Sequence, residues 1–257
     1  MKALIVKDDA RYEYTQRFLA AKGHSFCLRH PAEELDYAIF PLMDEVDKVV
    51  YSADFFRSLK SHVRVFSGVR NIYLEEMCHF AGLDYHVMLE DETVAIKNAV
   101  ATSEGVIAFI IKNHDRIMQE TSVLIIGYGR CGSDLARRLK SLGADVCTLV
   151  RNDAKAAAAW ADGVKSIRLS QFADKHFEII VNTVPNEILT PQMMEYRQGV
   201  LLVDIASSPH GFDINFAKKH NEKSALLPGL PGKYAIKTSG QILGEYVESI
   251  LRGGNGA

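Results

Sequence analysis

The chain has 257 residues, which is room for about two domains of ~100–150 residues each. Its composition, 47% hydrophobic and 24% charged, is typical of a globular protein with a sizeable core. The formal net charge of −2 argues against a nucleic-acid-binding protein, because such proteins need a basic field to displace counterions from phosphates.

Residues 1–92 alternate strand and helix signals, with Gly23 and Gly82 placed to end two helices. This alternation predicts parallel strands joined by right-handed crossovers. We expect a flavodoxin-like domain that binds the substrate or a partner. The expected strands are Ala3–Val6, His24–Leu28, Tyr37–Phe40, Val49–Tyr51, Val63–Ser67 and Tyr85–Leu89, and the expected helices are Tyr12–Ala21 and Ile72–Ala81.

Residues 93–257 repeat the same rhythm, so the predicted fold class is α/β with two doubly wound parallel-sheet domains. A linker helix should open this domain, interrupted near Thr102 and Ser103, whose hydroxyls can cap a second helix. The expected elements are the strands Ser122–Ile126, Asp145–Val150, Glu178–Val184, Val200–Ile205 and Ala225–Leu227, the alanine-rich helix Ala154–Ala161, and a last helix Thr238–Leu251.

Further compositional signals predict a cytoplasmic protein without a membrane span or a metal. The longest apolar runs, such as Val106–Ile111, are far shorter than the ~20 residues that cross a bilayer. The opening sequence MKALIVKDDA has too short an apolar stretch for a signal peptide. The cysteines, at positions 27, 78, 131 and 147, lack metal-ligand spacing, and we expect all of them to be reduced thiols.

The most informative segment reads VLIIGYGRCGSDLARRLKSLGADVCTLV. A strand runs into Gly127-x-Gly129-x-x-Gly132, and a helix and a second strand follow, as a Rossmann dinucleotide fingerprint requires. In that pattern the three glycines make the tight turn, admit the pyrophosphate and let the helix pack on the strand. The helix N-terminus at Arg130 and Cys131 favours an anion. We predict a bound dinucleotide rather than an empty glycine-rich turn.

The tip of the second strand distinguishes NADP from NAD. An NAD site usually has an acid there, ~20 residues after the glycine turn, which accepts a hydrogen bond from the ribose 2′-OH. Here the tip reads Val150-Arg151-Asn152-Asp153. Arg151 can pair with a 2′-phosphate and Asn152 can add a hydrogen bond, so NADP is favoured. Asp153 leaves NAD possible.

Two later strands also end in polar loops, at the edge where open parallel sheets bind ligands. The first loop reads Asn182-Thr183-Val184-Pro185 and the second Asp204-Ile205-Ala206-Ser207. The alternative for each is an ordinary strand-end turn. We predict cofactor contacts from Asn182, Thr183, Pro185 and Ala206.

Two further segments lie near the end of the sequence, PGLPG at 228–232 and KTSGQIL at 237–243. Together with the segments above they resemble the A subunit of bacterial dipicolinate synthase, which makes pyridine-2,6-dicarboxylate. They are the most specific part of the resemblance, since many dehydrogenases share the glycine turn. The chain departs from the family pattern at Ser208, where a basic residue is expected before Pro209, and in a shorter first domain. Matches at Asp9-Ala10-Arg11, Phe66-Ser67-Gly68 with Asn71, 98–105, 182–185 and 204–207 carry the resemblance nearly end to end.

The resemblance implies a fold related to D-2-hydroxyacid dehydrogenases, with the last helix packing back on the first domain. It also implies a nicotinamide cofactor, a partner in the form of a flavoprotein-like B subunit, and oxidation of dihydrodipicolinate or its hydrated precursor to dipicolinate in sporulation. We further expect a homo-oligomer. The reaction would transfer a hydride to NADP and release a proton, while the protein orients the ring against the nicotinamide.

A substrate with two carboxylates needs cations or helix N-termini at both ends. Arg11 follows the first strand, Ser67 and Gly68 with Asn71 open a helix after another strand, and Lys237 lies beside the proline-glycine segment just before the last helix. We expect these residues to bind the substrate at the cleft between the domains. The alternative for Arg11 and Lys237 is a solvated surface cation.

The proton acceptor has two candidates among the nine histidines, His86 and His210. No Ser/His/Asp or Cys/His arrangement is apparent. Two other functions remain open: a 2-hydroxyacid dehydrogenase of the same layout, for which the Ser207-Ser208-Pro209 loop supplies no arginine, and a non-catalytic nucleotide-binding subunit. The remaining histidines are expected to be structural (His79) or at the surface (His24, His30, His62, His114, His176 and His220).

Overall fold

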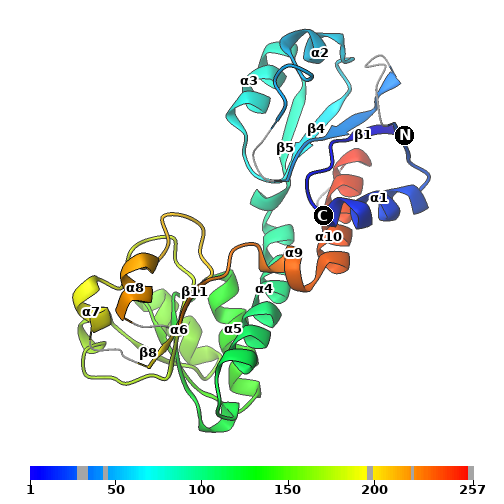
Figure 1. Ribbon diagram of the computed structural model, residues 1–257. Helices are drawn as coiled ribbons and strands as arrows, with labels where there is room; N and C mark the ends of the chain where they lie inside the picture. Colours follow the sequence, from blue (N-terminus) through cyan, green and yellow to red (C-terminus); the bar gives the residue numbers. More distant parts are fainter. Residues whose placement is uncertain (28–33, 43–45, 196–198, 221–222, 254–257) are drawn as a thin grey trace. The chain divides into compact units, whose positions relative to one another are not determined.

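The computed structural model describes residues 1–27, 34–42, 46–195, 199–220 and 223–253 (Figure 1). The chain forms two compact units, of which unit 1 is Met1–Asn98 with Ala235–Ala257 and unit 2 is Ala99–Tyr234. The first unit therefore ends after residue 98, whereas the sequence predicts a boundary after residue 92. The C-terminal helix belongs to unit 1.

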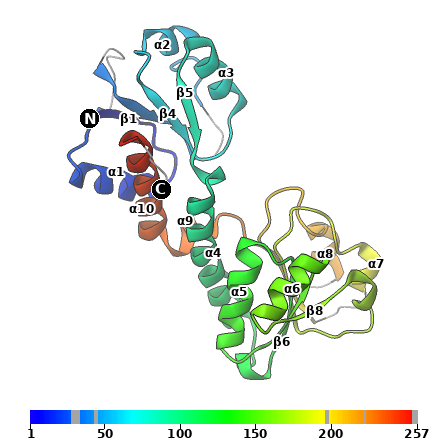
Figure 2. The same ribbon diagram turned by 180° about the vertical axis from the view of Figure 1, so that it is seen from behind.

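Unit 1 is built on a five-stranded parallel sheet in the order β2-β1-β3-β4-β5. Helices α2 and α3 cover one face, and α1 and α10 cover the other (Figures 1 and 2). This order is that of a doubly wound sheet whose switch point lies between β1 and β3. The elements are β1 (Lys2–Ile5), α1 (Arg11–Ala21), β2 (Ser25–Cys27), β3 (Tyr37–Ile39), α2 (Ala53–Ser58), β4 (Arg64–Ser67), α3 (Ile72–Ala81), β5 (Asp84–Val87) and α10 (Ile236–Leu251), with the 3₁₀ turn η2 (Met88–Glu90).

Helix α10 packs closely on α1, although the two are far apart in sequence. A Cβ on Gly240 would lie 2.3 Å from the carbonyl oxygen of Arg11. The Thr15 hydroxyl donates a hydrogen bond of 2.9 Å to the Gly240 carbonyl. A side chain at position 240 would therefore separate the helices.

The expectation that His24 lies at the surface is wrong. Its imidazole is 5% exposed, with Nε2 at 2.9 Å from the Glu248 carboxylate on α10. Its Nδ1 lies 2.8 Å from the Tyr37 hydroxyl. The physical reason is that α10 covers a residue whose local sequence is polar. His30 lies outside the described residues.

The strand expected at Val49–Tyr51 is also wrong, because residues 48–51 form a turn before α2. The Asp47 carboxylate accepts hydrogen bonds from the backbone N–H groups of Val49 and Val50, at 3.0 and 3.1 Å. An aspartate that bonds the backbone two and three residues ahead favours a turn over a strand. Val49 is consequently exposed rather than part of the sheet.

Unit 2 contains a six-stranded parallel sheet in the order β11-β10-β9-β6-β7-β8, the Rossmann order. This confirms the predicted fold class. Helices α4, α5 and α6 pack on one face, and the segment with α7 and α8 packs on the other. The elements are α4 (Glu92–Asn113), η3 (Met118–Glu120), β6 (Ser122–Ile126), α5 (Arg130–Ser141), β7 (Asp145–Leu149), α6 (Asp153–Ala161), β8 (Lys165–Ile167), η4 (Leu169–Gln171), β9 (Ile179–Asn182), α7 (Pro191–Glu195), β10 (Leu201–Asp204), α8 (Ile214–His220), β11 (Ser224–Leu226) and α9 (Leu230–Tyr234).

Helix α4 is continuous, so the interruption expected near Thr102 and Ser103 is wrong. Ser103 is fully buried inside the helix, and Val106 and Ile110 are fully buried in the unit 2 core. This packing outweighs the tendency of hydroxyl side chains to start a new helix. By length and hydropathy alone α4 is long and apolar enough to cross a membrane, a test that core helices of soluble proteins also pass.

Candidate dinucleotide-binding site

The glycine turn joins β6 to α5 with no room for side chains at two of its glycines. Gly127 has a φ of +96° and its N–H donates to the Leu149 carbonyl at 2.9 Å. A Cβ on Gly132 would lie 2.3 Å from the Gly127 carbonyl oxygen. At Gly129 a Cβ would meet no protein atom within 4 Å. Gly129 therefore borders open space, where a ligand can approach the backbone.

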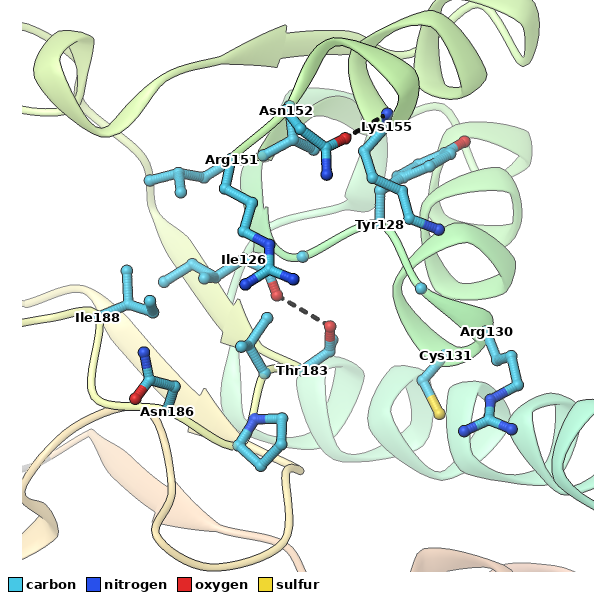
Figure 3. Close-up of a pocket in the computed structure, with 16 residues that line it drawn as sticks. Ile126, Tyr128, Arg130, Cys131, Arg151, Asn152, Lys155, Thr183, Asn186 and Ile188 are labelled. Carbon is cyan, nitrogen blue, oxygen red and sulfur yellow. Dashed lines mark hydrogen bonds between the residues drawn. The ribbon is translucent and has the colours of Figure 1, made fainter. Parts of the chain in front are cut away.

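Helix α5 begins at this open space. Its N-cap residue is Gly129, so no side chain satisfies the first N–H groups of the helix. Arg130 and Cys131 occupy its first turn, and both line a cavity of about 670 Å³ (Figure 3). Burial raises the pKa of the Cys131 thiol, so the thiol stays neutral beside the helix N-terminus. Unpaired N–H groups, the helix dipole and a neighbouring guanidinium make this end of the cavity suited to an anion.

The other end of the cavity lies at the tip of β7. Arg151 extends into it from the residues that follow the strand (Figure 3). Asn152 is the N-cap of α6, with its side-chain oxygen accepting from the Lys155 N–H at 2.9 Å. Asp153, the acid expected to oppose a 2′-phosphate, forms an ion pair with Arg168. The sequence thus predicted the location of Arg151 but not the partner of Asp153.

The loop after β9 forms a third wall. Thr183 and Pro185 line the cavity, and the Thr183 hydroxyl donates to the Ile126 carbonyl at 2.8 Å. Asn182 and Ala206 are buried and lie outside this lining. The Asn182 amide donates to the Val184 carbonyl and to the Asp204 carboxylate, at 2.9 and 3.1 Å. Asn182 therefore shapes the loop that contacts the cavity.

The Asp204 carboxylate organises the next loop. It accepts hydrogen bonds from the backbone N–H groups of Ala206 and Gly211, at 2.8 and 2.6 Å. His210 lies in this loop with a φ of +71°, and its Nδ1 is 3.0 Å from the Ala206 carbonyl. His210 is half-buried and does not line the cavity.

In unit 1, Arg11 is bound by a neighbour. Its guanidinium donates twice to the Asp9 carboxylate, both at 2.8 Å, and the Arg11 side chain is 7% exposed. This bidentate pair lowers the pKa of Asp9. The sequence had offered two alternatives for Arg11, a substrate ligand and a solvated cation. The Arg11 side chain is buried, and the Asp9 carboxylate compensates its charge within unit 1.

The other substrate candidates differ in their surroundings. The Ser67 hydroxyl is buried and bonded to the Val69 carbonyl and the Tyr85 hydroxyl, and a Cβ on Gly68 would lie 2.2 Å from a backbone oxygen. Asn71 caps α3 through the Leu74 N–H and also lines a cavity of about 860 Å³. Lys237 is exposed in the first turn of α10. The charged residues that line the Asn71 cavity are Lys7, Asp8, Asp47, Lys48 and Arg70.

His86 lies in β5 at the edge of the unit 1 sheet. Its ring stacks on Phe66 with centroids 5.1 Å apart, and burial lowers its pKa. Its Nε2 is buried without a hydrogen-bond partner among the described residues. The residues around it, from α3, β5 and α10, line a cavity of about 350 Å³ distinct from the one that Asn71 lines. His86 is therefore a half-buried imidazole whose surroundings favour the neutral form.

Sequence reasoning missed several residues of the dinucleotide cavity. Tyr128, inside the glycine turn, donates to the Asp162 carboxylate at 2.6 Å and is nearly buried. Lys155 follows Arg151 by four residues and lines the same cavity. This spacing puts both residues near one strand tip, so Lys155 could have been predicted from the sequence. Asn186 and Ile188 belong to an irregular loop whose path no local signal predicts.

The cysteines form no disulfide bond within the described residues. Cys27, Cys78, Cys131 and Cys147 are all free thiols, as expected. Within the described ranges no cluster of His, Cys, Asp or Glu side chains is arranged to hold a metal ion.

A protein-family model described as the NADPH-binding domain of acetohydroxy acid isomeroreductase matches residues 117–234. The chain is 33% identical over 208 residues to the dipicolinate synthase A subunit of Bacillus subtilis (strain 168), covering 80% of this chain and 70% of that protein. The crystal structure of the B. subtilis protein superposes with a TM-score of 0.90 at 28% identity, covering 98% of this chain and 96% of that one.

Two further solved structures are similar over nearly the whole chain. The dipicolinate synthase A subunit from Bacillus halodurans has a TM-score of 0.89 and 25% identity, covering 97% of each chain. The apo-structure of D-lactate dehydrogenase from Escherichia coli has a TM-score of 0.63 at 15% identity, covering 98% of each chain, which is a likeness of fold alone.

Proposed function

Because the chain belongs to the family of the dipicolinate synthase A subunit, we propose that it oxidises dihydrodipicolinate, or the hydrated precursor, to dipicolinate with NADP. The proposal is supported by this family membership together with the cavity at the switch point of the Rossmann sheet, which is suited to a dinucleotide. When bound, the nicotinamide accepts the hydride that the dihydropyridine ring loses as it becomes aromatic.

The residues of unit 2 fit a dinucleotide. Gly129 leaves the backbone open, the α5 N-terminus offers N–H groups, and the Thr183 loop closes one side. Their role in the reaction is to bind the pyrophosphate and to hold the nicotinamide in one orientation. Hydride transfer then has a smaller entropic contribution to its activation barrier.

The choice of NADP over NAD rests on Arg151. No described side chain forms an ion pair with its guanidinium, and the acid at the strand tip, Asp153, is held by Arg168. A guanidinium matches a phosphate as a planar fork of donors. One such contact is worth ~1.5–3 kcal/mol, which corresponds to a preference of roughly ten- to hundredfold for NADP.

For the substrate, we propose that the Asn71 cavity binds a carboxylate. Lys7 and Lys48 line it and carry ammonium groups, and the carboxylates of Asp8 and Asp47, which also line it, already accept backbone N–H groups. The flavoprotein-like partner, the homo-oligomer and the cytoplasmic location belong to the same proposal. His86 and His210 remain the candidates for accepting the proton.

The test is turnover of dihydrodipicolinate by the purified chain, alone and with a flavoprotein-like second subunit, followed as NADPH absorbance and as dipicolinate. We expect weak or no activity alone and activity in the mixture. Lack of dipicolinate formation in the mixture, with NADP bound, would exclude the proposed reaction and favour a nucleotide-binding subunit without catalysis.

The cofactor assignment is tested separately by measuring dissociation constants of NADP and NAD for the wild type and Arg151→Asp at one salt concentration. We expect the substitution to weaken NADP and leave NAD unchanged or tighter. Equal binding of the two nucleotides by the wild type would contradict the role of Arg151.

A further inference from the structure

A second cation accompanies Arg151 in the dinucleotide cavity. Lys155 lies in the first turn of α6, one helical turn after Arg151, and both side chains line the cavity (Figure 3). Among the described residues, no hydrogen bond or ion pair engages the ammonium group of Lys155. Its backbone N–H is bound to the Asn152 side chain, so the start of the helix that carries it is fixed.

The acid at the strand tip has a partner outside the cavity. Asp153 forms an ion pair with Arg168, whose guanidinium also donates to the Val150 carbonyl at 3.0 Å. Arg168 is thereby anchored to the backbone of the same tip. Neither Asp153 nor Arg168 is among the residues that line the cavity.

We propose that Lys155 binds the 2′-phosphate of NADP together with Arg151, and that Arg168 is a positioning residue that keeps the Asp153 carboxylate away from it. This inference rests on the proposed use of NADP and extends it to residues that the glycine-turn pattern does not assign. A phosphomonoester carries a charge of about −1.5 to −2 at neutral pH, so one guanidinium leaves part of the charge uncompensated. The ammonium of Lys155, which lines the same cavity, supplies the second charge as a mobile point donor.

The decisive comparison uses ligands that differ only in the 2′-phosphate. The full chain and its Lys155→Ala variant are titrated calorimetrically with NADP and NAD, and with adenosine 2′,5′-bisphosphate and adenosine 5′-monophosphate. The substitution removes the ammonium but keeps the backbone N–H that Asn152 caps. Lys165→Ala is the matched control, because Lys165 is an exposed lysine of β8 that pairs with Asp145, outside the cavity.

We expect Lys155→Ala to weaken NADP and the bisphosphate about tenfold and to change NAD and the monophosphate less than about twofold. The control should change none of the four. An unchanged NADP affinity, or equal losses for NADP and NAD, would overturn the assignment of Lys155. If the wild type binds neither dinucleotide, the proposed function itself fails. Loss of bisphosphate affinity in Lys155→Ala identifies a phosphate site, and inorganic phosphate as competitor shows whether the adenosine is needed.

The role of Arg168 is tested by rescue. Arg168→Gln frees the Asp153 carboxylate and should lower the ratio of NADP to NAD affinity several-fold. Adding Asp153→Asn removes the freed charge and should restore the ratio, which a purely structural role of Arg168 does not predict. A ratio that stays low in the double variant would refute the positioning role.

Discussion

Replacing Gly132 by alanine and replacing Gly129 by alanine should have different consequences, although the two glycines share one turn. A Cβ at position 132 would lie 2.3 Å from the Gly127 carbonyl oxygen, 3.0 Å from its carbonyl carbon and 3.2 Å from the Thr183 hydroxyl. These atoms belong to backbone and to a bonded side chain, so the turn must move by about 1 Å to restore van der Waals contact.

Such overpacking costs ~1–3 kcal/mol of folding free energy, or roughly 2–12 °C in Tm for a chain of this size. The displaced turn also misaligns the N–H groups at the α5 N-terminus, each worth ~1.5–3 kcal/mol to an anion, so dinucleotide affinity should fall about ten- to hundredfold. NADP and NAD should lose equally, because both carry the pyrophosphate.

At Gly129 a Cβ meets no protein atom within 4 Å and its φ is −93°, which alanine adopts readily. Gly129→Ala should therefore keep the wild-type Tm and weaken both dinucleotides by occupying their space. Calorimetric titration and thermal unfolding measured on the same samples separate the two effects. A stable Gly132→Ala variant with full affinity, or a Gly129→Ala variant that binds as the wild type does, would refute this reading of the turn.

Three further outcomes are expected. Asn71→Asp keeps the side-chain oxygen that caps α3 but adds a negative charge to the cavity that Asn71 lines. Dipicolinate binding should therefore weaken about tenfold while NADP affinity stays unchanged. Equal losses of affinity for dipicolinate and NADP would indicate unfolding. Gly240→Ala should lower Tm by roughly 2–12 °C without changing NADP affinity, because its Cβ would lie 2.3 Å from the Arg11 carbonyl oxygen. Arg11 lowers the pKa of Asp9 below its ordinary value of 3.8, so their pairing stabilises the fold above that pH and loses its effect as the pH falls through the lowered pKa. The stability difference between wild type and Arg11→Met in urea should therefore shrink below pH 3.8, and a difference that grows there would contradict the pairing.

The sequence by itself determined the architecture of both units. Strands of the right length, alternating with helices, leave little choice besides parallel sheets with crossovers, and α3 has the bounds that its spacing and Gly82 predict. The dinucleotide cavity could be predicted from the sequence equally well. The functions of Gly127, Gly129 and Gly132 depend on backbone geometry within one continuous strand–turn–helix segment.

The tertiary structure alone decided how charged side chains are used. His24 looks like a free polar group in sequence, but α10, more than 200 residues later, packs on α1 and buries His24 against Glu248. The pairing of Asp153 with Arg168 likewise needs β8, a short strand that the pattern of residues did not predict. The partner of a side chain in another element depends on distances across the fold, whereas a sequence pattern gives only the distances along one element. Which cation pairs with which acid is therefore decided only in the assembled sheet.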